Sequence, residues 1–298
     1  MDAVPLGVTD ALGWLAVAAF LASWALESRD RLGRAVGALG WGCFGLFWLL
    51  LVPRFAFVMR SPIETVLSIA AVPASAYAGY RLYAGHDAPR TLTRAVAAMG
   101  LFYLPFETIP LLGQLAVETV ARQAYLGITW LGYDVALTEG PADGYRSGLE
   151  FVRGGHTYAT HIVLACTGLG SMTVFAGLIA AVEAPLSRKL TAAAAAVGII
   201  YVLNIARNVF IAVAFGNQWF QVFVGPIAGL LGYSDPGLVS FFIADRVISQ
   251  GLSLLALAAI AVLVARIVPE LIAVLEEAAY VLTRTEIDLG RALSVDDR

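Results

Sequence analysis

Three residues in otherwise apolar segments carry side chains that could do covalent chemistry together: Cys166, Arg207 and Arg246. The thiolate of a cysteine is a strong nucleophile, and a nearby arginine favours it by charge. An arginine stays protonated, so it cannot act as a base, but it can stabilise a thiolate or the oxyanion of a tetrahedral intermediate. We therefore predict that Cys166 attacks a carbonyl group and that Arg207 and Arg246 are its electrostatic partners.

The neighbours of both arginines are polar and stand at helical spacing. Asn204, Arg207 and Asn208 are at i, i+3 and i+4, which places them on one helix face. The same spacing recurs in the next apolar segment, at Arg246, Ser249 and Gln250. Asn204 and Asn208 are therefore expected to support the site.

The face predicted around Cys166 is made of small residues, at Cys166, Gly170, Thr173 and Gly177. Small residues let helices pack closely, so this face is expected to point into the helix bundle and not towards lipid. The other cysteine, Cys43, has no such context and is interpreted as a packing residue.

Three further residues are weaker candidates for roles at the site. A leaving amine needs a proton, and either His161, five residues before Cys166, or His156 could supply it. Glu107 lies in the proline-containing stretch 104–110, which predicts a kinked helix, and it is expected to pair with an arginine.

The composition places the chain among membrane proteins. Of its 298 residues 59% are hydrophobic and 14% charged, and the mean hydropathy is +0.79. The net charge of −3 gives no basic surface for nucleic acid. The two cysteines form neither a disulfide framework nor a zinc motif, so no metal or organic cofactor is predicted.

The apolar segments predict an all-α polytopic fold with about seven spanning helices, roughly six to eight. The expected spans are about 10–27, 35–53, 61–82, 95–118, 160–182, 190–215 and 238–266. The first is taken as a retained helix, because no basic region of a signal peptide precedes it. A small extracytoplasmic hairpin is expected at 119–159. Residues 217–236 are expected to be interfacial or re-entrant, or an additional span.

Basic residues gather in alternate loops, at 29–34, 81–94 and 188–189. The positive-inside rule puts these loops in the cytoplasm, with the N-terminus outside and the C-terminus inside. Arg54 and Arg60 argue mildly against this orientation. In it, Cys166 and both arginines lie about 10 Å below the outer surface. Residues 1–268 would form the transmembrane domain and 269–298 an amphipathic cytoplasmic tail.

Three short motifs in successive segments resemble the exosortase/archaeosortase family of membrane cysteine transpeptidases. They are Ala165-Cys166-Thr167-Gly168, Asn204-Ile205-Ala206-Arg207-Asn208 and Asp245-Arg246. Bacterial exosortases have a histidine at the position of Arg246, whereas the archaeosortase branch has an arginine, as this chain does.

The resemblance implies a substrate and a reaction. Such enzymes act on secreted proteins that end in a Pro-Gly-Phe motif, an apolar helix and a short basic tail, the S-layer glycoprotein being one. The helix is removed and the new C-terminus becomes attached to a membrane lipid. Cys166 would form a thioester, which the amine of a phosphatidylethanolamine-like archaeal lipid would resolve.

Two other functions remain open from the residues alone. The arginines could bind anions in a transporter, because ionisable residues within a membrane often mark ion pathways. They could also stabilise a structural membrane subunit without catalysis. A transporter would need a continuous polar path, and the inner halves of the last three expected spans offer little polarity.

Overall fold

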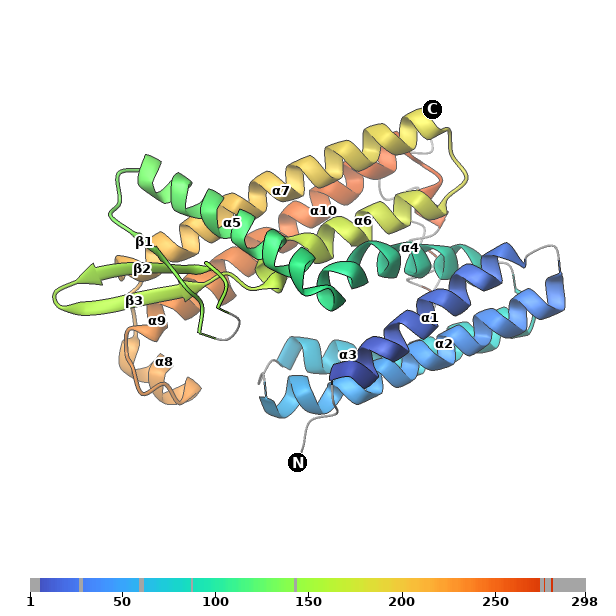
Figure 1. Cartoon of the computed structure of the whole chain (residues 1–298), viewed down its shortest axis with the longest axis horizontal. Helices are drawn as coiled ribbons and strands as arrows, with labels where there is room; N and C mark the ends of the chain where they lie inside the picture. The colour runs from blue at the N-terminus through green and yellow to red at the C-terminus, as the bar shows by residue number, and fades with distance from the viewer. Residues whose placement is uncertain are drawn as a thin grey trace. The chain divides into compact units, whose positions relative to one another are not determined.

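The structure is a computed structural model that describes residues 6–26, 29–58, 62–86, 88–141, 144–273, 276 and 280. Helices dominate it, and one small sheet interrupts them (Figure 1). In chain order the elements are α1 (Leu6–Ala25), α2 (Asp30–Pro53), the π-helical η1 (Arg54–Val58), α3 (Pro62–Tyr83), α4 (Ala88–Thr108), α5 (Pro110–Trp130), β1 (Ala136–Thr138), β2 (Gly148–Arg153), β3 (His156–His161), the 3₁₀ turn η2 (Leu164–Thr167), α6 (Leu169–Ala181), α7 (Leu186–Gly216), α8 (Val224–Leu231), α9 (Leu238–Phe242), the π-helical η3 (Ile243–Ser249) and α10 (Gln250–Ile267).

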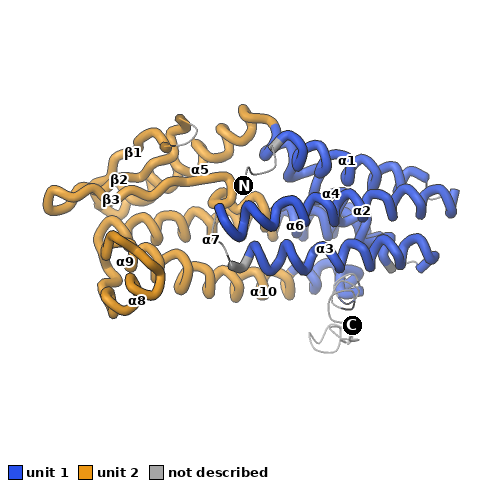
Figure 2. The backbone as a smooth tube through the Cα atoms, turned by 90° about the horizontal axis from the view of Figure 1, so that it is seen from below, with its two compact units in different colours: residues 1–108, 173–194, 264–298 blue, residues 109–172, 195–263 orange. Residues whose placement is uncertain are grey.

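The chain forms two compact units that interleave in sequence (Figure 2). Unit 1 holds residues 1–108, 173–194 and 264–298, and unit 2 holds 109–172 and 195–263. Every residue of the candidate site except Glu107 belongs to unit 2.

Unit 1 has an aromatic core between α1, α2 and their neighbours. Phe20 is fully buried, and its ring centroid lies 5.1 Å from that of Trp41. Leu82 of α3 and Ala97 of α4 complete the buried cluster. Cys43 is partly buried against the same core, as expected of a packing residue.

Unit 2 packs α5 and α7 against a three-stranded antiparallel sheet of order β1-β2-β3. Strands β2 and β3 pair from Gly148↔His161 to Arg153↔His156. Gly154 and Gly155, both with positive φ, join them in a two-residue turn. Alternate residues of β2, Leu149 and Phe151, are buried in the core that α5 and α7 share. The sheet thereby holds the chain that leads from β3 towards Cys166.

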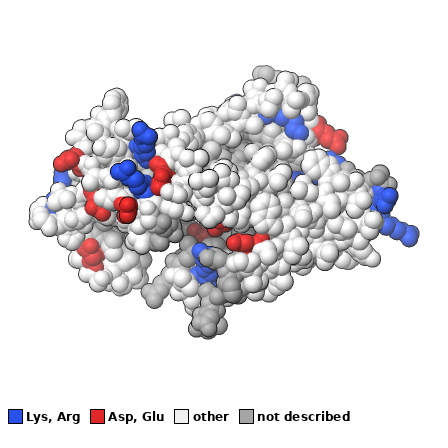
Figure 3. Space-filling model, in the orientation of Figure 1, with Lys and Arg blue, Asp and Glu red and all other residues white. Residues whose placement is uncertain are grey.

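Four helices are long and apolar enough to cross a membrane: Gly7–Ala25, Asp30–Val58, Leu186–Gly216 and Leu238–Ile267. A broken pair, Pro89–Thr108 and Pro110–Trp130, could supply a fifth. Large areas of the face in Figure 3 carry no charged side chain. Length and composition thus support a helical membrane protein with four or five candidate spans among the described residues, fewer than the seven expected. The prediction of an all-α fold is wrong in one respect, because a three-stranded sheet lies between α5 and α6 in the sequence.

The fourth expected span, 95–118, is not one helix. It breaks at Ile109, whose φ of −103° and ψ of 104° are extended, and α5 begins at Pro110. A residue before proline disfavours helical geometry, and proline suits the first position of a helix. The new helix then runs to Trp130, into the expected hairpin region. Its buried residues follow a helical spacing, at Val117, Val120, Ala121, Ala124 and Ile128, but polar residues between them lower the window hydropathy.

The fifth expected span, 160–182, is wrong in its first half. Residues up to His161 belong to β3, and the helix α6 begins only at Leu169 and has 13 residues. The hydropathy of residues 162–168 shows that they are apolar, but it does not show their backbone conformation. That conformation depends on the preceding strand β3, which pairs with β2. The predicted small face is confirmed only in its lower part: Thr173 is buried, and a Cβ on Gly177 would lie 2.8 Å from the Met99 nitrogen of α4. At Gly170 it is wrong, because this residue is exposed and an added Cβ would meet no atom within 4 Å.

The remaining predictions concern the sixth and seventh spans, residues 217–236 and the tail. The sixth span is confirmed as α7 and the seventh as the continuous run α9–η3–α10. Residues 217–236 hold the eight-residue α8, too short for an additional span. The predicted tail, 269–298, lies mostly outside the described residues.

Candidate active site

Cys166 lies on the single 3₁₀ turn η2, not on a helix as expected. Its backbone N–H donates to the Val163 carbonyl at 2.7 Å. The side chain of Thr167 connects the turn to the following helix. Its hydroxyl donates to the Leu164 carbonyl at 2.6 Å and accepts from the Leu169 N–H at 3.3 Å. The turn therefore ends where α6 begins, and Cys166 sits just before the first turn of that helix.

Two asparagines of α7 hold the Cys166 backbone. The Nδ2 groups of Asn204 and Asn208 both donate to the Cys166 carbonyl, at 2.8 Å and 2.9 Å. Both asparagines are buried, and Asn208 also donates to the Asn204 carbonyl at 3.0 Å. A carbonyl on an irregular turn has no helix partner, so these amides satisfy it and fix the turn against α7. The structure thus brings together three of the predicted residues.

Gly168 makes the close approach of the turn to α7 possible. Its φ of +79° favours glycine, because a side chain crowds the following carbonyl in that conformation. A Cβ at this position would also lie 3.0 Å from Cγ of Asn204. Both constraints act at the residue that follows Cys166 and Thr167, so the motif requires a glycine there.

Arg207 and Arg246 share one carboxylate. Arg207 donates from Nη2 to Oδ1 of Asp245 at 2.6 Å, and Arg246 Nε lies 3.4 Å from Oδ2 of the same residue. The exposed fractions of the side chains are 27% for Arg207, 15% for Asp245 and 49% for Arg246. Arg207 stands on α7 directly before Asn208, so the arginine bridge and the anchor of Cys166 share one stretch of helix.

Asp245 and Arg246 lie in the π-helical segment η3. The wider turn changes which residues share a face: Arg246 is exposed, whereas Ser249 is buried. The predicted common face of Arg246, Ser249 and Gln250 is therefore wrong. Single π-helical turns are often found at functional sites, where they redirect side chains.

Asp245 is the residue that the sequence interpretation missed as a member of the site. A signal was present, because an acidic residue directly before an arginine in an apolar segment needs a partner. The pattern alone did not show that this partner would be Arg207 on another helix.

The remaining candidates occupy different places. His161 is exposed at the end of β3, opposite Gly148. His156 begins β3, about 17 Å away along the strand, and its ring lies 4.6 Å from that of Tyr158. Glu107 belongs to unit 1 and accepts a hydrogen bond from Tyr103 at 3.2 Å. The expected pairing of Glu107 with an arginine stays a prediction.

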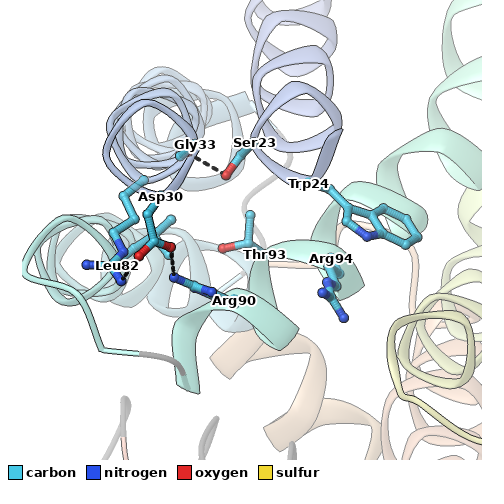
Figure 4. A pocket seen from close by; sticks show the side chains of 9 residues that line it. Ser23, Trp24, Asp30, Gly33, Leu82, Arg90, Thr93 and Arg94 are labelled. Carbon is cyan, nitrogen blue, oxygen red and sulfur yellow. Dashed lines mark hydrogen bonds and ion pairs between the residues drawn. The ribbon is translucent and has the colours of Figure 1, made fainter. Parts of the chain in front are cut away.

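A hollow lined by several charged side chains lies within unit 1 (Figure 4). Asp30 pairs there with Arg34 at 3.1 Å and Arg90 at 2.7 Å, and Arg94 pairs with Glu183 at 3.2 Å. No cysteine or histidine lines it. Across the described ranges, no group of three His, Cys, Asp or Glu side chains could hold a metal ion. The chemistry is therefore best sought around Cys166.

These features define a helical membrane protein in which a cysteine turn is anchored to α7, the helix that also carries one arginine of an arginine–aspartate–arginine bridge. Residues 8–242 match the family described as transmembrane exosortase, and the chain belongs to that family. The predicted resemblance to exosortases and archaeosortases is thereby confirmed.

Two curated relatives carry the name Archaeosortase A. The protein of Haloferax volcanii is 48% identical over 300 residues, covering 97% of this chain and 99% of its own. The protein of Natronomonas pharaonis is 46% identical over 275 residues, covering 90% of this chain and 87% of its own. No solved structure matches the chain significantly. Family and relatives together make the chain a membrane-embedded sorting transpeptidase of the archaeosortase type.

Proposed function

We propose that the chain cleaves the C-terminal sorting signal of secreted surface proteins through a thioester on Cys166 and passes the new C-terminus to a membrane lipid. The observation that carries this proposal is that one stretch of α7 both anchors the Cys166 turn, through Asn204 and Asn208, and carries Arg207, which is bridged through Asp245 to Arg246. The substrates would be proteins with a Pro-Gly-Phe motif, an apolar helix and a basic tail, such as an S-layer glycoprotein.

In the first step, Sγ of Cys166 attacks the carbonyl carbon of the scissile peptide bond. A C–S bond forms, and the carbonyl oxygen becomes an oxyanion that Arg207 and Arg246 stabilise. The C–N bond then breaks, and the leaving amine takes up one proton, which balances the proton that the Cys166 thiol loses on becoming the attacking thiolate. His161 is our candidate for the donor, because it is exposed and precedes Cys166 by five residues.

In the second step, an amine attacks the thioester carbonyl. The amine of a phosphatidylethanolamine-like archaeal lipid would form an amide and release the Cys166 thiol. Water in its place would give a free carboxylate, so the acceptor decides between lipid attachment and hydrolysis.

We further propose about seven spans with the N-terminus outside, residues 1–268 as the membrane domain and 269–298 as a cytoplasmic tail. The length of α6 supports a site that is recessed below one membrane surface, and the loop charges favour the outer one. Its 13 residues reach about 20 Å, whereas the hydrocarbon core is about 30 Å thick. If α6 ends at the cytoplasmic face, Cys166 lies about 10 Å below the outer surface. A signal helix leaving the membrane presents its scissile bond at that level.

The test is mass spectrometry of a substrate's C-terminus in cells that carry wild-type protein or Cys166→Ala. We expect a shortened, lipid-bearing C-terminus with the wild type and the intact signal with Cys166→Ala. Cys43→Ala is the matched control, because that thiol packs in the aromatic core of unit 1, and it should process normally. Normal processing by correctly inserted Cys166→Ala contradicts the proposal.

The alternative of an anion transporter is not favoured by any contact of the site. Both arginines are paired with Asp245, so a permeating anion would have to displace that carboxylate.

A further inference from the structure

Asp245 is held more firmly than either arginine that it contacts. Its two carboxylate oxygens are divided between two guanidinium groups, Oδ1 to Arg207 and Oδ2 to Arg246. Its side chain is 15% exposed, against 27% and 49% for the arginines. Arg207 and Asp245 stand on different elements, α7 and η3, so this ion pair also fixes one element to the other.

The charges of the three residues explain why such a bridge is useful. Two arginines close together repel, and the repulsion is strong where water is scarce. One carboxylate between them removes the repulsion and leaves a net charge of about +1 on the cluster. A thiolate or an oxyanion carries one negative charge, so its formation would make the whole site neutral.

We infer that Asp245 is a positioning residue of the reaction: it holds the guanidinium of Arg207 in place through the short contact to Oδ1, and it steadies Arg246 through the longer one. Asp245 does not touch the reacting atoms, because both of its oxygens are engaged by arginines. This inference rests on the proposed function, in which the arginines stabilise the oxyanion.

The contact distances predict an unequal dependence of the two arginines on Asp245. Arg207 is bound at 2.6 Å and is only 27% exposed, so its guanidinium has few other positions. Arg246 is bound at 3.4 Å and is 49% exposed, so it keeps more freedom. Loss of the carboxylate should therefore act mainly through Arg207.

The experiment measures kcat and KM of processing of a signal-bearing peptide by the full-length protein in lipid nanodiscs. Asp245→Asn should lower kcat by about 100-fold, the effect of a displacement of about 1 Å at a reacting group, with little change in KM. Asp245→Glu keeps the charge and should recover most of this loss. Asp134→Asn is the matched control, because Asp134 is exposed in the loop after α5 of the same unit, and it should behave as wild type.

A double variant separates positioning from a purely structural role. If Asp245 acts through Arg207, Arg207→Gln combined with Asp245→Asn should have nearly the kcat of Arg207→Gln alone. This double variant leaves no unpaired carboxylate next to the missing arginine, so it also tests the inference if Asp245→Asn alone does not fold.

Three outcomes overturn the inference: wild-type kcat in Asp245→Asn, no recovery in folded Asp245→Glu, or an additive loss in the double variant. Failure of the proposed function would look different, because wild type and Cys166→Ala would then give equal processing.

Discussion

At the scale of single residues, the carbonyl of Cys166 shows how the backbone of the proposed nucleophile is held. A serine or cysteine nucleophile on a regular helix has its backbone fixed by that helix. Here the backbone is irregular, and two side-chain amides from α7 replace the helix hydrogen bonds. The backbone of Cys166 is therefore held in a defined position before α6.

Replacing Asn208 by alanine tests this anchor. The variant keeps the bond from Asn204 but loses one of two donors to a partly buried carbonyl, so we expect a stability loss of about 1 kcal/mol. The rate of processing should fall by more than this, up to about 100-fold, because the nucleophile is displaced. Thermal unfolding in detergent and initial processing rates check the two effects.

Asn217→Ala is the matched control for the anchor. Asn217 follows α7 and donates to the Val213 carbonyl at 2.8 Å, away from Cys166. Its loss should affect stability similarly and processing little. Equal processing by the two variants would contradict the role of Asn208.

At the scale of elements, the sheet and α7 together place the Cys166 turn. Phe151 of β2 is buried, and its ring lies against Gly216 at the end of α7 so closely that an added Cβ would overlap it. The chain runs from β3 directly into the Cys166 turn, and α7 carries Asn204, so this contact connects both sides of the anchor.

Gly216→Ala should therefore loosen the sheet from α7. Overpacking of this kind costs about 1–3 kcal/mol, because the ring or the helix has to move. We expect faster proteolysis in the β1–β2 connection and slower processing. Gly198→Ala, on the same helix with open space around its Cα, is the control and should leave both unchanged. Equal protease resistance of the two variants would show that the contact does not hold the sheet.

At the scale of the whole molecule, the charged loops bear on orientation. Lys189, which was expected in a loop but lies in the first turn of α7, donates to the Ala180 and Val182 carbonyls at 2.9 Å each, where α6 ends. Its neighbour Arg188 pairs with Glu270 at 2.6 Å. A cation at the C-terminus of a helix is favourable, so the basic pair 188–189 takes part in the packing of unit 1 and is also a candidate orientation signal.

Single-cysteine labelling tests the proposed orientation. In a Cys43→Ala, Cys166→Ala background, Asp134→Cys should react with a membrane-impermeant maleimide on intact cells. Ser187→Cys, beside the basic pair 188–189, should react only after permeabilisation. Both positions are exposed, so access to the reagent depends on the side of the membrane. The reverse pattern would place the candidate site on the cytoplasmic side and contradict the proposed substrate.

The sequence by itself determined the membrane class and most helix positions, and it supplied the candidate side chains of the proposed site. Composition and the length of apolar segments can be read from the sequence alone. They set the free energy of transfer of a helix into lipid, so they are enough to predict the membrane class. The helical period likewise predicted that Asn204, Arg207 and Asn208 share a face of α7, and they do.

Only the tertiary structure decided the backbone at Cys166 and the partner of the arginines. Residues 160–168 are as apolar as a span, but the pairing of β3 with β2 and the positive φ of Gly168 keep them out of a helix. Asp245 pairs with Arg207, which lies on another helical element and 38 residues earlier in the sequence. Such hydrogen bonds and ion pairs depend on which segments meet in space, and neither hydropathy nor periodicity contains that information.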